Sequence, residues 1–158
     1  MSNSIVNLFQ RSPAFREAAE LRQSQLTKPT GALGILEQNA VWLADIQQTE
    51  VPETRPAATI VFAADHPVSA LGVSAYPREV TPMMVINLAQ GGAAASVLSR
   101  NLGIPLHVVD VGTEPYPAPV SGEGITWTRH PVSGTCGDLV HEDAMSEEAL
   151  VAALDQGR

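Results

Sequence analysis

The sequence predicts an α/β fold built around a parallel sheet. Two runs, 57–63 and 106–111, are apolar on both faces, as strands of a covered parallel sheet are. A helical stretch separates these runs, and the order strand, helix, strand is typical of a parallel sheet. The chain has 158 residues, of which 44% are hydrophobic and 16% charged, and this suits one globular domain with a substantial core.

Residues 1–56 are expected to form a helical segment that precedes the α/β domain, 57–158. Ser12 and Pro13 predict that the first helix begins at Pro13 and ends near Gln25. Serine accepts a hydrogen bond from the first turn of a helix. Proline at the first position lacks only an N–H that would be unpaired there.

A turn-rich stretch and a second helix follow in the same segment. The proline and glycines of 26–34 mark the turn. Apolar residues at helical spacing then predict a helix that ends near Gln48. The polar, proline-marked stretch 49–56 is expected to connect this segment to the first strand.

The rest of the α/β domain is predicted from helix caps, glycine breaks and apolar runs. The expected elements are a helix that Thr81 caps and that runs from Pro82 to about Gln90, a helix that ends at Gly103, strands over 106–111 and 125–129, and a last helix capped by Ser146. Together they predict a Rossmann-like parallel sheet flanked by helices. No strand follows the last helix, so the sheet is expected to be incomplete and to leave strand edges unpaired.

Charge and composition argue against several classes of partner. The chain has 9 basic and 17 acidic residues, a formal net charge of −8, whereas nucleic acids and anionic membranes are held mainly by Lys and Arg. We therefore expect no nucleic acid and no membrane as a partner. The single cysteine, Cys136, excludes a disulfide within the chain. The N-terminus has no secretory pattern and no apolar run reaches about 18 residues, so a cytoplasmic protein is predicted.

The loop after the first strand carries the first candidate site. Asp65 and His66 stand where that strand ends, and ligands of open α/β sheets bind beyond the carboxyl ends of the strands. A structural interpretation is equally open, in which Asp65 caps backbone N–H groups and His66 packs in a turn. Cys136 is a candidate nucleophile, but the sequence places no histidine beside it, and a spare thiol is the simpler interpretation.

No metal and no cofactor are expected. The 4 histidines lack the paired spacing of metal ligands. The glycine fingerprint of a dinucleotide site does not follow the first strand, although Asp110 at the end of the second strand is a candidate for binding a ribose hydroxyl. Gly91 and Gly92 either let a phosphate approach a helix N-terminus or let helices pack closely.

Three ordered segments of the chain resemble the signatures of one family. They are KPTGALGILEQNAVWLADIQ, VFAADHPVSALGVSAYPREVT and GGAAASVLSRNLGIPLHVVDVG. Each is similar to a segment of the nicotinate-nucleotide–dimethylbenzimidazole phosphoribosyltransferase family, and the similarity runs from about Leu26 to the C-terminus. Pro67 stands where members usually have glycine, and Met83 and Met84 stand where members commonly have a glutamine.

The resemblance implies a pentosyl transfer in the synthesis of the cobalamin lower ligand. Phosphoribose moves from nicotinate mononucleotide to 5,6-dimethylbenzimidazole, and the products are α-ribazole phosphate and nicotinate. A homodimer and no metal are also implied. The residues implied to line the benzimidazole slot are Ser74, Ala75, Tyr76, Met83 and Met84. Asp65 and His66 would hold the loop in shape, and the two methionines are alternatively part of the core face of a helix.

Family members are much longer than this chain, and their catalytic glutamate and phosphate-binding segments lie in the C-terminal half. The chain resembles the N-terminal half, so no catalytic residue is assigned. It is expected to be inactive alone and to need the missing half as a partner. An alternative is a non-catalytic module that binds an azole or nicotinate. A third hypothesis is a small α/β hydrolase that uses Asp65 and His66.

Overall fold

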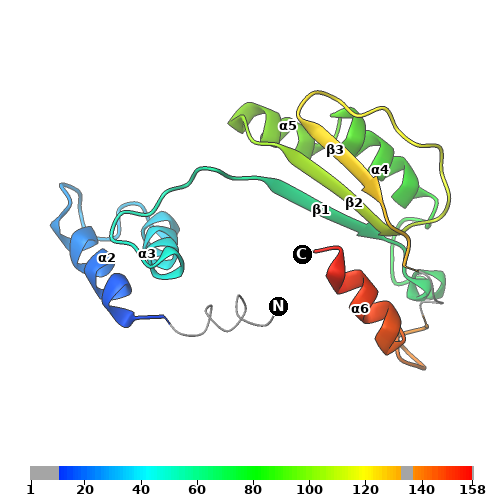
Figure 1. The fold of residues 1–158 in the computed structure, drawn as a ribbon, viewed down its shortest axis with the longest axis horizontal. Helices are drawn as coiled ribbons and strands as arrows, with labels where there is room; N and C mark the ends of the chain where they lie inside the picture. The colour runs from blue at the N-terminus through cyan, green and yellow to red at the C-terminus, as the bar shows by residue number, and fades with distance from the viewer. Residues whose placement is uncertain (1–10, 133–136, 158) are drawn as a thin grey trace. The chain divides into compact units, whose positions relative to one another are not determined.

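The chain folds into two units, Met1–Pro56 and Ala57–Arg158. The computed structural model describes residues 11–132 and 137–157. The first unit is helical, and the second contains a parallel sheet with helices (Figure 1). Within the described ranges, every helix is too short or too polar to span a bilayer.

Among the described residues of the first unit, 11–56, the structure has two helices of 13 residues each. They are α2 (Pro13–Gln25) and α3 (Ile35–Gln47). The side chain of Ser12 accepts a hydrogen bond of 3.4 Å from the backbone N–H of Ala14, which confirms the predicted cap. The buried core of this unit consists of Ala19, Val41 and Ala44.

A glutamate of α3 holds the turn that joins the two helices. Glu37 Oε1 lies 2.8 Å from Nζ of Lys28 and accepts a hydrogen bond of 3.1 Å from the backbone N–H of Leu33. These contacts tie the turn-rich stretch 26–34 to the first turn of α3.

Three parallel strands form an open sheet in the second unit, in the order β1-β2-β3. The strands are β1 (Thr59–Ala64), β2 (Leu106–Gly112) and β3 (Ile125–Arg129). Thr59 lies beside Leu106, and Leu106 lies beside Ile125, so the strands begin level with one another. Their carboxyl ends therefore meet at one edge of the sheet. The predicted α/β fold with an open parallel sheet is confirmed.

Two helices, α4 (Val80–Gln90) and α5 (Ala94–Leu102), lie on the same side of the sheet (Figure 1). α4 contacts all three strands. Its Val85 packs against Leu106 and Val108 of β2, and these three side chains are almost completely buried. Removing such aliphatic surface from water is the main favourable contribution to folding, so this cluster anchors α4 on the sheet.

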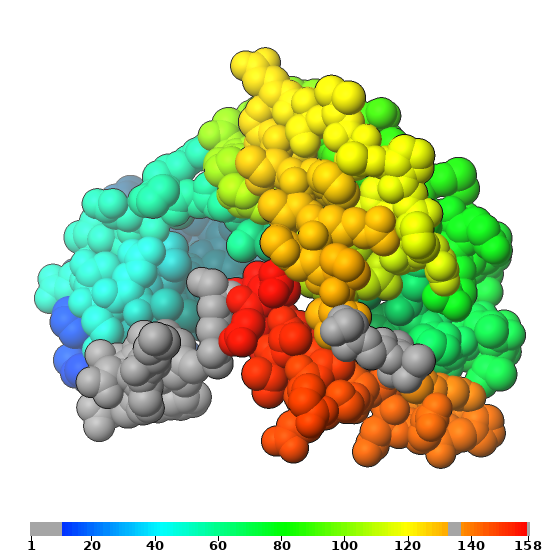
Figure 2. Space-filling view, turned by 45° about the vertical axis from the view of Figure 1, so that its right-hand side comes forward, coloured from blue at the N-terminus to red at the C-terminus, as the bar shows by residue number. Residues whose placement is uncertain are grey.

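The described part of the second unit also contains two further helices and a long loop. The short 3₁₀ helix η1 (Pro67–Leu71) follows β1 almost directly. The last helix, α6 (Glu147–Asp155), begins at the predicted cap, because the hydroxyl of Ser146 accepts a hydrogen bond of 3.2 Å from the backbone N–H of Ala149. The loop 113–124 joins β2 to β3 and runs over the surface of this unit (Figure 2).

One face of the first strand is covered much less than the other in the part of the chain that the structure describes. Val61 and Ala63 pack against the core. By contrast, Ile60 and Phe62 are 56% and 52% exposed. Successive side chains of a strand point to opposite faces, and α4 and α5 lie on the same face. The prediction that this strand is buried on both faces is therefore wrong for the described chain.

Candidate functional site

A pocket of about 440 Å³ opens beside the carboxyl end of β1. The loop after β1 and the first turns of α4 form its walls. Five of the seven predicted site residues line it: Asp65, His66, Ser74, Tyr76 and Met84. Because ligands of open α/β sheets bind at this edge, we take this pocket as the candidate site.

The other two predicted residues, Ala75 and Met83, do not line the pocket. Met83 is 59% exposed. Neighbouring residues of an α-helix point roughly 100° apart, so Met83 faces a different direction from Met84. That any of the seven residues binds a ligand stays a prediction.

Asp65 ties the loop after β1 to the loop after β2. Its Oδ2 accepts a hydrogen bond of 2.9 Å from the backbone N–H of Glu114, and its own N–H donates to the carbonyl of Gly112 at 3.1 Å. His66 precedes Pro67, the first residue of η1, where the missing N–H of proline breaks no helical hydrogen bond. These contacts favour the interpretation in which Asp65 shapes the loop.

Asp110 is a fully buried carboxylate at the carboxyl end of β2. Its Oδ1 accepts hydrogen bonds from the backbone N–H groups of Gly112 at 3.0 Å and Thr113 at 2.9 Å. Its Oδ2 accepts hydrogen bonds of 2.7 Å from the hydroxyls of Thr113 and Tyr116. A carboxylate has about four acceptor sites, and all are used here. None is left for a ribose hydroxyl, so that candidate role is wrong.

The charge of Asp110 is balanced from the neighbouring strand. Burial alone would raise the pKa of this carboxyl group, but hydrogen bonds from Thr113, Tyr116 and Gly112 outweigh burial and lower the pKa. Nε of Arg129, in β3, lies 3.2 Å from Oδ2 of Asp110. Asp110 is therefore ionised at neutral pH and joins the ends of β2 and β3.

Tyr116 and Trp127 extend this arrangement. The indole Nε1–H of Trp127 donates a hydrogen bond of 2.9 Å to the Tyr116 hydroxyl, and the two ring centroids lie 6.1 Å apart, edge to face. The guanidinium of Arg129 lies 4.9 Å from the centre of the Tyr116 ring. Burial and the hydrogen bond to Asp110 raise the pKa of Tyr116 to about 12. We call Asp110, Thr113, Tyr116, Trp127 and Arg129 the Asp110 cluster.

Sequence analysis named Asp110 but missed its partners in the cluster, and it missed Arg78. Arg78 lines the pocket, and its Nη2 lies 2.8 Å from Oε1 of Glu114. One signal for it was present, because Arg78 is the only Lys or Arg between residues 56 and 99. For the cluster, Asp110 followed closely by a glycine and Thr113 is typical of a turn closed by an aspartate side chain.

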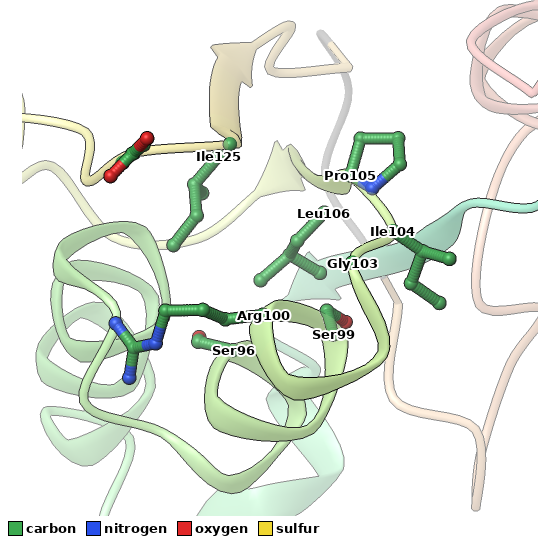
Figure 3. A pocket seen from close by; sticks show the side chains of 10 residues that line it. Ser96, Ser99, Arg100, Gly103, Ile104, Pro105, Leu106 and Ile125 are labelled. Carbon is green, nitrogen blue, oxygen red and sulfur yellow. The ribbon is translucent and has the colours of Figure 1, made fainter.

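A second hollow, of about 450 Å³, lies beside the first residues of β2 and β3, Leu106 and Ile125 (Figure 3). Its two serines, from α5, already have partners. Ser96 donates a hydrogen bond of 2.8 Å to a backbone carbonyl, and Ser99 donates one of 2.8 Å to a threonine hydroxyl. This edge holds the amino ends of the strands, so the pocket after β1 remains the better candidate site.

Gly91 and Gly92 allow close packing after α4. Gly91 has a φ of +90°, and a Cβ atom there would lie 3.3 Å from Nη1 of Arg100. A Cβ atom on Gly92 would overlap the side chain of Asn87. Of the two interpretations that the sequence left open, the structure therefore favours close packing over the approach of a phosphate.

Two further kinds of site, a metal site and a cysteine nucleophile, were considered from the sequence. Among residues 11–132 and 137–157, no three or more His, Cys, Asp or Glu residues are grouped so that they could hold a metal ion. Cys136 lies outside the described residues. Its candidacy as a nucleophile therefore stays a prediction.

Comparison with known proteins assigns the chain to a family. A family model described as Phosphoribosyltransferase matches residues 9–158. The chain belongs to this phosphoribosyltransferase family. The match begins before Leu26, where the resemblance was expected to begin, so α2 also belongs to the family pattern. The resemblance predicted from the three ordered segments is confirmed.

Curated relatives of the chain are named nicotinate-nucleotide–dimethylbenzimidazole phosphoribosyltransferase. The relative from Bradyrhizobium diazoefficiens is 58% identical over 146 residues, which are 92% of this chain and 40% of the relative. The relative from Pseudomonas aeruginosa is 45% identical over 147 residues, again 92% of this chain and 40% of the relative. The chain thus spans about 40% of the length of these relatives.

A solved structure of the same family has the same fold. CobT from Thermus thermophilus is 39% identical to this chain and superposes with a TM-score of 0.69. The superposition covers 92% of this chain and 42% of the CobT chain. The family assignment and the open parallel sheet therefore agree with each other.

Proposed function

We propose that this phosphoribosyltransferase chain contributes to the transfer of phosphoribose from nicotinate mononucleotide to 5,6-dimethylbenzimidazole. In this proposal the pocket after β1 is the benzimidazole slot. One observation carries it, namely that Ser74, Tyr76 and Met84 line a single pocket at the carboxyl end of β1. A phenol ring, a thioether and a hydroxyl suit a flat, mostly apolar ligand with ring nitrogens. The names of the relatives support the same pair of substrates.

The transfer forms one bond and breaks one bond at C1 of the ribose. A ring nitrogen of dimethylbenzimidazole attacks C1, while the bond from C1 to the nicotinate nitrogen breaks and its electron pair stays on nicotinate. The benzimidazole N–H proton passes to a base. Holding the two rings on opposite sides of C1 is the part of catalysis that a shaped pocket supplies.

We assign no catalytic base within these 158 residues. The acceptor sites of Asp110 are filled, and Asp65 holds the backbone N–H of Glu114. We therefore propose that the chain alone binds dimethylbenzimidazole without turnover. Turnover would need further residues of the kind that the longer relatives contain.

We also propose that the protein acts as a homodimer in the cytoplasm. The exposed aliphatic side chains of α5 support self-association, since they leave apolar surface on the described unit: Val97, Leu98 and Leu102. The content of one cysteine supports a reducing compartment. Sedimentation of the purified chain tests the first part, and a monomer at all concentrations would contradict it.

Nicotinate release tests the proposed function. The purified chain is incubated with nicotinate mononucleotide and dimethylbenzimidazole, alone and together with the remaining part of the Bradyrhizobium diazoefficiens relative as a separate polypeptide. We expect release only from the mixture. Tyr76→Ala should weaken dimethylbenzimidazole binding about tenfold, because a large aromatic contact is lost. Val120→Ala, at a residue 81% exposed and outside the pocket, is the matched control.

Other results of these experiments would contradict the proposed function or favour one of the alternatives. Release by the chain alone would contradict the absence of a base, and Asp65 and Glu79 would be the next carboxylates to replace. Binding of dimethylbenzimidazole without release from the mixture would favour the alternative, a non-catalytic module for azoles or nicotinate. The hydrolase hypothesis is rejected if His66→Ala changes no hydrolytic activity of the chain.

A further inference from the structure

Two unpaired polar atoms share the pocket after β1. Oγ of Ser69 and Nε of Arg78 are buried and have no hydrogen-bond partner among the described residues, and both side chains line the pocket. Only four such atoms occur in the part of the chain that the structure describes. A buried polar group without a partner costs free energy, so two of them beside one cavity point to a group that the cavity receives.

Arg78 supplies the positive charge of this pocket. Among the described residues that line the pocket, it is the only Arg or Lys. Its Nη2 lies 2.8 Å from Oε1 of Glu114, whereas its Nε has no partner among the described residues. A guanidinium carries five N–H donors in a planar fork, so it can bind a second anionic group while one edge faces Glu114.

The contact between Arg78 and Glu114 is one that a ligand can replace. The two side chains are 36% and 55% exposed, and exposed ion pairs contribute little to stability. The backbone of Glu114 is held separately, because its N–H donates to Asp65 at 2.9 Å. The loop after β2 therefore keeps its hydrogen bond to Asp65 when the Glu114 side chain moves away from Arg78.

We propose that Arg78, with Ser69 beside it, binds the anionic group of the nicotinate-containing substrate. This inference rests on the proposed function, which supplies two substrates of different charge. Dimethylbenzimidazole is uncharged, whereas nicotinate mononucleotide carries a carboxylate and a phosphate, and both groups accept paired N–H bonds from a guanidinium. The pocket then has an apolar part at Tyr76 and Met84 and an anion-binding part at Ser69 and Arg78.

Three small probes test the proposal on the full chain. Nicotinate and nicotinamide have the same ring and differ in charge, and inorganic phosphate carries the charge without the ring. We expect calorimetric titration at low salt to show nicotinate binding about tenfold more tightly than nicotinamide, as expected for one charge-assisted contact. Phosphate that competes with nicotinate would show that the site accepts either anion, and phosphate that does not compete would show that the site selects the carboxylate.

Variants separate recognition from structure. Arg78→Gln should abolish the preference for nicotinate over nicotinamide, and Ser69→Ala should reduce it. Glu114→Gln removes the competing negative charge and should tighten nicotinate binding about threefold. If the ion pair between Arg78 and Glu114 were only structural, Arg78→Gln and Glu114→Gln would both weaken nicotinate binding. Arg16→Gln removes the same charge from another exposed pair, with Glu20 at 3.2 Å, and should change nothing.

Three results would overturn the proposal. The first is an equal affinity of the unmodified chain for nicotinate and nicotinamide. The second is a folded Arg78→Gln variant that keeps the preference for nicotinate. The third is weaker nicotinate binding by Glu114→Gln. Failure of this inference alone leaves dimethylbenzimidazole binding and its loss in Tyr76→Ala intact, whereas failure of the proposed function removes dimethylbenzimidazole binding itself.

Discussion

The carboxylate of Asp65 accepts a hydrogen bond of 2.9 Å from the backbone N–H of Glu114, which lies 49 residues further along the chain. The side chain of the same Glu114 pairs with Arg78 at 2.8 Å. The loops that follow β1 and β2 are therefore joined twice. The shape of the candidate pocket depends on both contacts, because Asp65 and Arg78 line it.

Replacement of Asp65 by alanine should loosen the pocket. The Glu114 N–H would lose a charged acceptor, and the free energy of unfolding should fall by about 2 kcal/mol. Dimethylbenzimidazole affinity should fall as well, because the loop is no longer held. Urea unfolding and calorimetry measure the two effects. Glu20→Ala, at an exposed carboxylate of α2, is the control, and equal losses in the two variants would contradict the prediction.

Alanine variants of Met84 and Met83 test whether the pocket after β1 is the benzimidazole slot. Met84 lines the pocket and Met83 does not, although the two are adjacent in α4. Met84→Ala should weaken dimethylbenzimidazole binding roughly tenfold, since three carbon-sized groups are lost from the wall but the side chain is 45% exposed, so only about half of their full burial energy is lost. Met83→Ala should leave the affinity unchanged. Equal effects in a binding titration would mean that Met83 also reaches the ligand.

The Tyr116 hydroxyl should make stability depend on alkaline pH. The pKa of Tyr116 rises from an ordinary value of 10.0 to about 12 in the folded chain. The folded chain holds this proton more tightly than the unfolded chain. The resulting stability is present in full below pH 10.0 and is lost as the pH rises through about 12.

Tyr116→Phe isolates this effect. The variant lacks the hydroxyl that donates to Asp110 and accepts from Trp127, so it should be about 1–3 kcal/mol less stable near neutral pH. Its free energy of unfolding should then change less than that of the unmodified chain across the alkaline range. Tyr76→Phe keeps the Asp110 cluster and should retain the full alkaline loss in urea unfolding. A loss that survives in Tyr116→Phe would assign the titration to another group.

Alanine variants of Gly91 and Gly103 test how closely the chain packs at the ends of α4 and α5. Both end a helix at positive φ, +90° and +63°, but only Gly91 has side chains within 4 Å of the place of a Cβ atom. Alanine at either position should cost about 1–2 kcal/mol of backbone strain. Gly91→Ala should cost more, because its methyl group meets Arg100 and Ile125. Thermal unfolding that ranks Gly103→Ala as the less stable variant would contradict this.

Two helix starts were predictable because capping joins residues only two or three positions apart. The cap predicted at Thr81 was wrong, because α4 begins at Val80, directly after Glu79. Ser12 and Ser146 each precede a helix, and each side chain accepts the expected backbone hydrogen bond. The coverage of β1 was not predictable in the same way. Its residues are apolar on both faces, so the pattern holds no information on which face α4 and α5 will cover. Val61 packs against the core, and Phe62 does not belong to it.

The family, the order of the helices and strands, and the stretch that forms the candidate pocket can all be predicted from the sequence alone. Each of these follows from neighbours in the chain or from ordered motifs. By contrast, that Met84 rather than Met83 lines the pocket and that Arg78 faces Glu114 follow from the three-dimensional packing of the chain. The physical reason is that contacts across 36 and 49 residues arise when the ends of parallel strands meet. No local spacing specifies which side chains then come together.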